Sequence, residues 1–167
     1  MIIREERQDD AQRIRAVNLA AFETSTEADL VDVLRRRATP LVSLVAEDDA
    51  GVIGHVMFSP ATLDSEPGLT LMGLAPMAVV PSRQRQGVGS SLVREGLERC
   101  RQLNVAAVVV LGHPAYYPRF GFVPAVRLCL RSEYEVPEEA FMVRELRDGV
   151  LTGRSGTIRY HPVFGEF

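Results

Sequence analysis

The fold of this chain is decided by the stretch Gln84-Arg85-Gln86-Gly87-Val88-Gly89-Ser90. An apolar run, Leu71 to Val80, precedes it and ends at Pro81, and an amphipathic helical pattern, Val88 to Leu103, follows it. A glycine-bearing turn between a strand and a helix start leaves backbone N–H groups exposed, and the helix dipole adds partial positive charge there. The stretch therefore predicts a site for a phosphate or pyrophosphate, and a phosphorylated small molecule as the ligand.

Two other phosphate-binding turns fit this stretch poorly. The P-loop of nucleotide hydrolases places Lys and then Ser or Thr after its second glycine, whereas Ser90-Ser91 follows here. The dinucleotide turn carries a third glycine on the helix, and Leu92 stands in that place. The sequence thus argues against nucleotide hydrolysis and against a dinucleotide cofactor. For the motif alone, a glycine-lined helix start that binds nothing remains the alternative.

The flanking segments predict one α+β domain with a mixed sheet. Two strand-like runs joined by Asp48-Asp49-Ala50-Gly51 form a hairpin signal. Gly73 and Pro76 predict a bulge or a distorted edge in the strand before the glycine turn. That strand, the following helix and an all-apolar strand predict a right-handed βαβ crossover from Leu71 to Leu111. The predicted strands are Ile2–Arg4, Leu41–Glu47, Val52–Phe58, Leu69–Val80, Val105–Leu111, Phe141–Val143 and Gly156–Tyr160.

Two helices are predicted ahead of the first hairpin. Asp9 or Asp10 is expected to cap the first, whose apolar face holds Ile14. Thr26 and Asp29 have the spacing of a capping box at the start of the second. The second helix is expected to end with Arg35-Arg36-Arg37, where the helix dipole favours cations.

The composition argues against several classes of protein. The chain has 167 residues and a net charge of −3, which does not favour a nucleic-acid binder. Cys100 and Cys129 are expected to pack in the core, with neither a disulfide framework nor a zinc site. The N-terminus lacks a signal-peptide pattern, and no apolar run reaches the ~20 residues of a membrane helix. The sequence therefore predicts a cytoplasmic protein without membrane partners.

The order of the motifs resembles the GCN5-related N-acetyltransferase (GNAT) family. Its pyrophosphate turn reads Gln/Arg-x-x-Gly-x-Gly/Ala, which Gln84, Gly87 and Gly89 match, and a helix, an apolar strand and Tyr117-x-x-x-Gly121-Phe122 follow. The Tyr-Tyr-x-Arg-Phe-Gly-Phe ending is similar to that of one bacterial subgroup. The resemblance implies one domain over residues 1–167. It also implies a mostly antiparallel mixed sheet in which two parallel central strands splay apart, flanked by helices.

The resemblance further implies an N-acetyltransferase that uses acetyl-CoA as cosubstrate, and an acceptor amine on a small molecule or a protein. Tyr117 occupies the family position of the general acid that protonates the departing thiolate. The implied cofactor contacts are Met77, Ala78, Val79, Gln84, Arg85, Gln86, Gly87, Val88, Gly89 and Ser90. Amides at the glycine turn would hold the pyrophosphate, and the strand backbone would hold the pantetheine arm. The family often forms homodimers, so a homodimer is also expected.

The general base is not identified by the sequence. Bringing an alkyl ammonium to its neutral form at pH 7 costs about 4–5 kcal/mol. Many family members carry a glutamate four residues before the position of Met77, and here that residue is Gly73. The candidates are Glu23, Glu27, His55 and His113, or a water that relays a proton to a backbone carbonyl. The missing glutamate leaves a second function open, a sensor that binds acyl-CoA without turnover.

Overall fold

A long antiparallel hairpin forms the spine of the fold, and the computed structural model describes it together with all of residues 1–167. Its arms are β3 (Gly51–Leu63) and β4 (Glu66–Val79). Both are longer than the sequence predicted, because the far end of β3 pairs with β9 (Gly156–Tyr160), which comes almost 100 residues later in the chain. Local patterns give no sign of such a distant partner.

The remaining strands extend this hairpin into one nine-stranded mixed sheet, in the order β1-β2-β3-β4-β5-β8-β6, with β9 on β3 and β7 on β9. Most pairs are antiparallel, whereas β4–β5 and β7–β9 are parallel. These strands are β1 (Ile2–Glu5), β2 (Val42–Asp48), β5 (Ala107–Leu111), β6 (Val123–Pro124), β7 (Leu130–Ser132) and β8 (Phe141–Glu145). The predicted α+β fold is confirmed.

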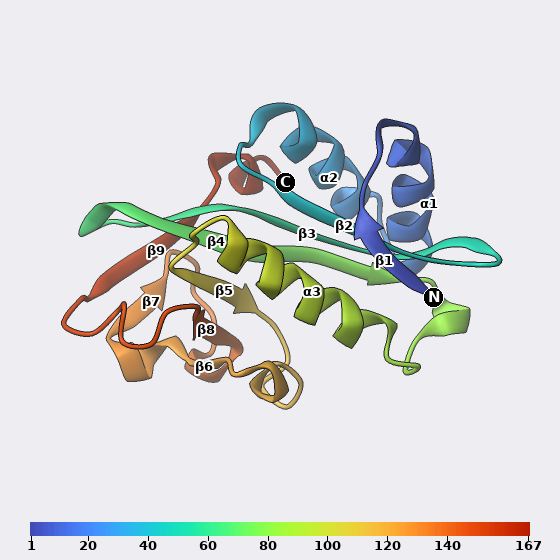
Figure 1. Ribbon diagram of the computed structural model, residues 1–167. Helices are drawn as coiled ribbons and strands as arrows, with labels where there is room; N and C mark the ends of the chain where they lie inside the picture. The colour runs from blue at the N-terminus through green and yellow to red at the C-terminus, as the bar shows by residue number, and fades with distance from the viewer.

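Three helices cover the two faces of the sheet (Figure 1). In that view α1 (Ala11–Ala21) and α2 (Thr26–Arg37) lie above the long strands, and α3 (Val88–Gln102) lies below them. One apolar cluster fills the space between α3 and the sheet, and a second lies beneath α1 and α2. A third cluster holds the C-terminal strands against β3–β5. None of the helices has the length and apolar character needed to cross a bilayer.

The β4–α3–β5 crossover opens a gap in the sheet. Parallel pairing joins only the residues Leu71 to Gly73 with Ala107 to Val109, although β4 continues to Val79. Just beyond Gly73, two residues of β4, Ala75 and Pro76, stand opposite a single residue of β3, which is a β-bulge. The bulge and the early end of pairing confirm the predicted irregularity and the predicted splay.

Two sequence expectations are wrong in detail. The second helix begins at Thr26, but its N-cap is Ser25, whose hydroxyl donates to Asp29 Oδ2 at 3.1 Å. Asp29 also forms an ion pair with Arg15 at 2.8 Å. Its carboxylate therefore does not complete the predicted capping box with Thr26. Cys100 is buried as expected, whereas Cys129 is exposed and follows a 3₁₀ turn with a left-handed φ of 61°. Cys129 therefore belongs to a surface turn and does not pack in the core.

Asp10 fixes the N-terminal strand to the rest of the fold. Its carboxylate is fully buried and accepts hydrogen bonds from Arg4 Nη1 at 2.7 Å and from the Arg7 backbone N–H at 2.6 Å. The Arg4 hydrogen bond, aided by the Arg7 amide, lowers the pKa of Asp10 from 3.8 to about 2. The carboxylate therefore stabilises the fold above about pH 4, and this contribution is lost as the pH falls toward 2.

We expect Asp10→Ala to lower the free energy of unfolding at pH 7 by about 3 kcal/mol, because it removes the buried partner of Arg4 and of the Arg7 backbone N–H and leaves Arg4 with Glu47 alone. Urea denaturation measures this change. The neighbouring Asp9 is exposed, and Asp9→Ala should change stability by less than about 0.5 kcal/mol. Equal effects of the two substitutions would contradict the anchoring role of Asp10.

Candidate functional site

A pocket of about 490 Å³ lies at the N-terminus of α3, next to the open end of β4. Its lining joins the end of β4, the glycine turn and the 3₁₀ turn that follows β5. The lining residues are Met77, Val79, Arg83, Gln84, Arg85, Gly87, Gly89, Ser90, Tyr116 and Arg119. We call this pocket the cradle.

The backbone of the glycine turn shapes the cradle. Gly87 is the N-cap of α3 and has φ 86°, a left-handed conformation that glycine adopts without strain. Its carbonyl accepts the first helical hydrogen bond, from Ser91 N–H at 3.0 Å. The N–H groups of the first turn, from Val88 to Ser90, have no intrahelical acceptor and are available to an anion.

Two glutamine side chains hold this turn in place. Gln84 Nε2 donates to the Val79 carbonyl at 2.9 Å, and Gln86 Nε2 donates to the Ser82 carbonyl at 3.2 Å. The turn is thereby tied to the end of β4 before any ligand arrives. The glutamine at the head of the motif therefore has a structural role that does not depend on binding.

The cradle carries positive charge from arginines alone, since the whole chain contains no lysine. Arg83 is paired with Asp48 at 3.0 Å, whereas no ion pair holds Arg85, whose φ is 63°. Arg119 lies with its guanidinium 4.4 Å from the centre of the Tyr116 ring. These cations and the orphan amides together make the cradle suited to a di-anion such as a pyrophosphate.

Tyr116 and Arg119 are site residues that the motif analysis did not assign. Tyr116 Oη lies 3.0 Å from Ser90 Oγ, and Arg119 Nε donates to the Tyr116 carbonyl at 2.8 Å. The two side chains form one wall of the cradle opposite the helix start. Their spacing of three residues, with an aromatic and a cationic side chain in a tight turn, is the signal that would have indicated this pair.

Tyr117 points away from the cradle and into the core. Only 8% of it is exposed, and its ring packs edge-on against Phe122 at 5.7 Å. Burial, with a smaller effect of Tyr116, raises the pKa of Tyr117 to about 12. Its phenol therefore keeps its proton at neutral pH and is a hydrogen-bond donor, as an acid must be.

Most of the predicted cofactor contacts gather in the cradle. The exceptions are Ala78, Gln86 and Val88, which do not line it. Ala78 and Val88 are buried, and the Gln86 side chain is exposed and bound to Ser82. For Val88 the backbone N–H at the helix start remains the group that faces a ligand.

None of the four candidate bases lines the cradle. Glu23 and His113 are exposed, and Glu27 is half-buried in the first turn of α2. His55 is fully buried, and its Nε2 lies 2.9 Å from Ser43 Oγ. Burial and the charge of Arg35 lower the pKa of His55 to about 3, so its imidazole is neutral.

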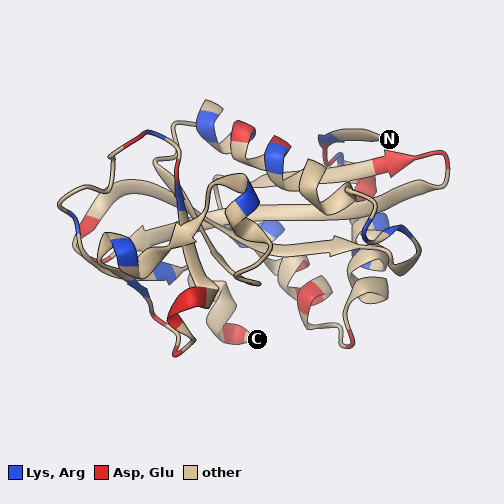
Figure 2. Ribbon diagram, turned by 90° about the horizontal axis from the view of Figure 1, so that it is seen from below, with Lys and Arg blue, Asp and Glu red and all other residues tan.

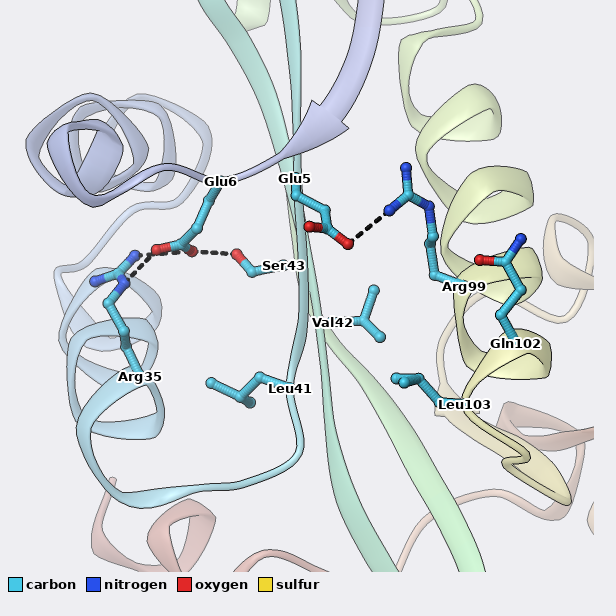
Figure 3. Close-up of a pocket in the computed structure, with 9 residues that line it drawn as sticks. All are labelled: Glu5, Glu6, Arg35, Leu41, Val42, Ser43, Arg99, Gln102 and Leu103. Atoms are coloured by element: carbon cyan, nitrogen blue, oxygen red, sulfur yellow. Dashed lines mark hydrogen bonds and ion pairs between the residues drawn. The ribbon is translucent and has the colours of Figure 1, made fainter.

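A different pocket, of about 400 Å³, lies near the C-terminal end of α3 and is lined by Ser43, the neighbour of His55 (Figure 3). There Glu6 bridges Arg35 and Ser43, while Glu5 pairs with Arg99 at 2.6 Å. Because α3 has 15 residues, this pocket lies about 20 Å from the cradle. We assign its polar groups to holding β1 between α2 and α3, and not to the chemistry at the cradle.

The charges outside the cradle form no single band. Figure 2 shows basic and acidic segments interspersed over the face that it presents. Many of them are paired, such as Arg37 with Glu166 at 2.8 Å and Arg99 with Glu95 at 3.0 Å. The structure also contains no group of three metal-ligating side chains. At the cradle, by contrast, the orphan amides of α3 lie beside Arg85, which no ion pair holds.

The chain matches a known domain family and several known proteins over most of its length. The model of the acetyltransferase (GNAT) domain matches residues 40–124. The chain is 43% identical, over 100% of both chains, to the uncharacterized N-acetyltransferase YhbS of Escherichia coli K12. The crystal structure of E. coli YhbS in complex with CoA has a TM-score of 0.92 and covers 99% of this chain and 92% of that one.

A second solved structure comes from Brucella melitensis. It is a GNAT family acetyltransferase in complex with acetyl-CoA, 35% identical to this chain, with a TM-score of 0.79. The match covers 98% of this chain and 97% of that one. The similarity therefore extends beyond the glycine turn to nearly the whole sheet and its helices.

Proposed function

Because this chain belongs to the GNAT family of acetyltransferases, we propose that it transfers the acetyl group of acetyl-CoA directly to a primary amine within a ternary complex. The whole chain, residues 1–167, would act as one acetyltransferase domain. The observation that carries this proposal is the cradle, where the first-turn amides of α3 and the arginines face a space that suits a pyrophosphate.

The position of the cradle indicates the path that the rest of the cofactor follows along β4. The pantetheine arm runs from the cradle along Val79 and Met77 toward Gly73, where β4 and β5 come together. The backbone near Met77 would then polarise the acetyl carbonyl and stabilise the oxyanion of the tetrahedral intermediate. The β-bulge at Ala75 and Pro76 supports this, since it interrupts regular pairing beside the expected position of the thioester.

The reaction needs one new bond and one broken bond. The amine nitrogen attacks the thioester carbon, the C–S bond breaks, and the thiolate of coenzyme A takes a proton. We assign that proton to Tyr117, whose phenol stays protonated because burial raises its pKa to about 12. The attacking amine loses a proton to water and the Tyr117 phenolate regains one from water, so the products are the amide and the coenzyme A thiol and the protein returns to its starting charge.

Thiol release with a panel of primary amines tests this function. We expect coenzyme A to appear only when an amine is present, with an equal amount of acetylated amine detected by mass spectrometry. The chain has no lysine, so acetylation of its own side chains does not confuse the result. Cys129 is an exposed thiol, and Cys129→Ser removes its reaction with the detection reagent.

The alternative is a sensor that binds acyl-CoA without turnover. Binding of coenzyme A with no thiol release from any amine would support the sensor and contradict the enzyme. The family membership and the protonated Tyr117 favour the enzyme.

A further inference from the structure

Gly73 has no side chain, and the ring of Tyr160 occupies the space beside it. A Cβ atom on residue 73 would lie 2.4 Å from Tyr160 Cε1 and 2.6 Å from Cδ1, closer than non-bonded carbon atoms approach. Tyr160 comes from β9 at the end of the chain, where it pairs with Ala61 of β3. Its ring therefore reaches across β3 to β4. A side chain on residue 73 would need the space that the phenol ring of Tyr160 already fills. We call this space the shared volume.

This volume lies at the closed end of the strand gap. Gly73 is the last residue of β4 that pairs with β5, so a thioester that enters from the cradle points toward it. Met72 and Leu74 pack in the cluster beneath α3, whereas Leu71 and Tyr160 belong to the cluster on the other face. The Tyr160 ring thus lies across the sheet from α3 and the cradle. The ring therefore borders the expected position of the thioester from the face of the sheet opposite α3.

The neighbours of Tyr160 are mostly aromatic. Tyr134 stacks on it with ring centres 6.1 Å apart, and Phe164 lies 5.2 Å away. Burial raises the pKa of Tyr160, and the phenols of Tyr134 and Tyr117 and the carboxylate of Glu133 raise it further, against a smaller opposing effect of the Leu111 backbone. Glu133 Oε2 accepts the backbone N–H of Tyr160 at 2.6 Å. The phenol of Tyr160 therefore stays neutral at pH 7 and takes no proton from an ammonium group.

We propose that Tyr160 is a specificity-determining residue of the acetyl-transfer site, because it fills the side-chain space of residue 73 with a neutral phenol and restricts acceptors to weakly basic amines. The α-amino group of an amino acid or peptide is the main biological example. This inference rests on the proposed function and adds the class of acceptor to it.

The size of the expected preference follows from the neutral fraction of each amine. At pH 7 about one α-amino group in 7 is neutral, against about one alkyl amine in 2,500, for pKa values near 7.8 and 10.4. With a neutral phenol beside residue 73 and the Glu133 carboxylate held by the Tyr160 backbone N–H, we expect the site to accept only the neutral form. We therefore expect kcat/KM at pH 7 to favour α-amines over alkyl amines on the order of 100-fold, after allowing for the greater nucleophilicity of the alkyl amine.

The first experiment compares two amines on the same framework. One is an amino-acid amide or short peptide with a free N-terminus, and the other is its lysine analogue with a blocked N-terminus. Wild-type protein should acetylate the α-amine on the order of 100-fold faster at pH 7. Its rate on the lysine amine should rise about tenfold per pH unit between pH 7 and 9. Equal rates at pH 7, or a lysine rate independent of pH, would overturn the inference.

The second experiment replaces the Tyr160 phenol with a carboxylate on residue 73, placed in the same space. Gly73→Glu combined with Tyr160→Ala should raise turnover of the lysine amine at pH 7 at least tenfold. The matched control, Gly73→Ala with Tyr160→Ala, changes the volume without adding a base and should not raise it. Gly73→Ala should destabilise the wild-type protein, since its Cβ meets the Tyr160 ring, and should destabilise the Tyr160→Ala protein much less. An equal loss of stability in both backgrounds would contradict the shared volume.

Two further variants keep the inference testable if the exchange variant does not fold. Tyr160→Phe retains the ring without a base and should retain the preference for α-amines. Glu27→Gln should leave turnover of both amines unchanged, although one Glu27 oxygen is buried without a partner. A tenfold loss in Glu27→Gln would reveal a base elsewhere and overturn the inference. No thiol release from any amine would instead defeat the proposed function, whereas release with a preference for lysine defeats only this inference.

Discussion

Replacing Gly89 with leucine is expected to weaken coenzyme A binding at least 100-fold and to leave the fold intact. Gly89 lies in the first turn of α3 and lines the cradle. A Cβ there would lie 3.3 Å from Tyr116 Oη and 3.4 Å from Met77 Cε, so the first carbon just fits. The remaining carbons of leucine would fill the space where the pyrophosphate approaches the amides. Calorimetry with coenzyme A measures the loss.

Gly68→Leu is the matched control. Gly68 also lies in a regular element, β4, but a Cβ there has no neighbour within 4 Å and the residue is exposed. We expect its affinity for coenzyme A to equal that of the wild type. Thermal melts of both variants establish that they are folded. Unchanged affinity in a folded Gly89→Leu protein would refute the cradle as the phosphate site.

Tyr117→Phe is expected to lower kcat more than tenfold while changing the affinity for acetyl-CoA little. The ring of Tyr117 packs against Phe122 and lies outside the cradle. Removing the Tyr117 hydroxyl should therefore leave the contacts to the phosphates in place. The proton that the thiolate takes would then have to come from water. Because burial raises the pKa of Tyr117 to about 12, the wild-type acid should stay functional through pH 10. Steady-state kinetics and calorimetry separate the two effects.

The adjacent tyrosine provides the contrast. Tyr116→Phe removes the hydroxyl that lies 3.0 Å from Ser90 Oγ at the cradle wall. We expect it to weaken cofactor binding a few-fold and to affect kcat less than Tyr117→Phe does. The opposite result, with Tyr116→Phe losing turnover and Tyr117→Phe retaining it, would transfer the role of acid to Tyr116.

The sequence predicted the parts of the fold that local patterns control. The glycine turn, the helix after it and the apolar strand lie where their periodicity placed them, because each is specified by neighbours in the chain. The family prediction is confirmed by the domain match and by full-length relatives. The length of β3 was missed because its partner β9 comes from the end of the chain. Propensity and alternation do not encode such distant pairing.

The candidate site was predictable to a similar degree. The turn residues Gln84, Arg85, Gly87, Gly89 and Ser90 line the cradle as the sequence led us to expect, because a helix start is a local feature, and their contact with a cofactor stays a prediction. Arg119 and Tyr116 were missed, since their part in the cradle depends on how a 3₁₀ turn after β5 meets α3. Tyr160 was missed for the same reason, because only the folded sheet brings β9 to Gly73. Residues supplied by distant elements are the ones that a single sequence does not reveal.

A crystal structure of this protein with acetyl-CoA would show whether the cradle holds the pyrophosphate. We predict pyrophosphate oxygens at about 3 Å from the backbone nitrogens of Val88 to Ser90, with the thioester in the gap beyond Gly73. A ligand bound elsewhere, with the amides at the start of α3 facing only solvent, would contradict it.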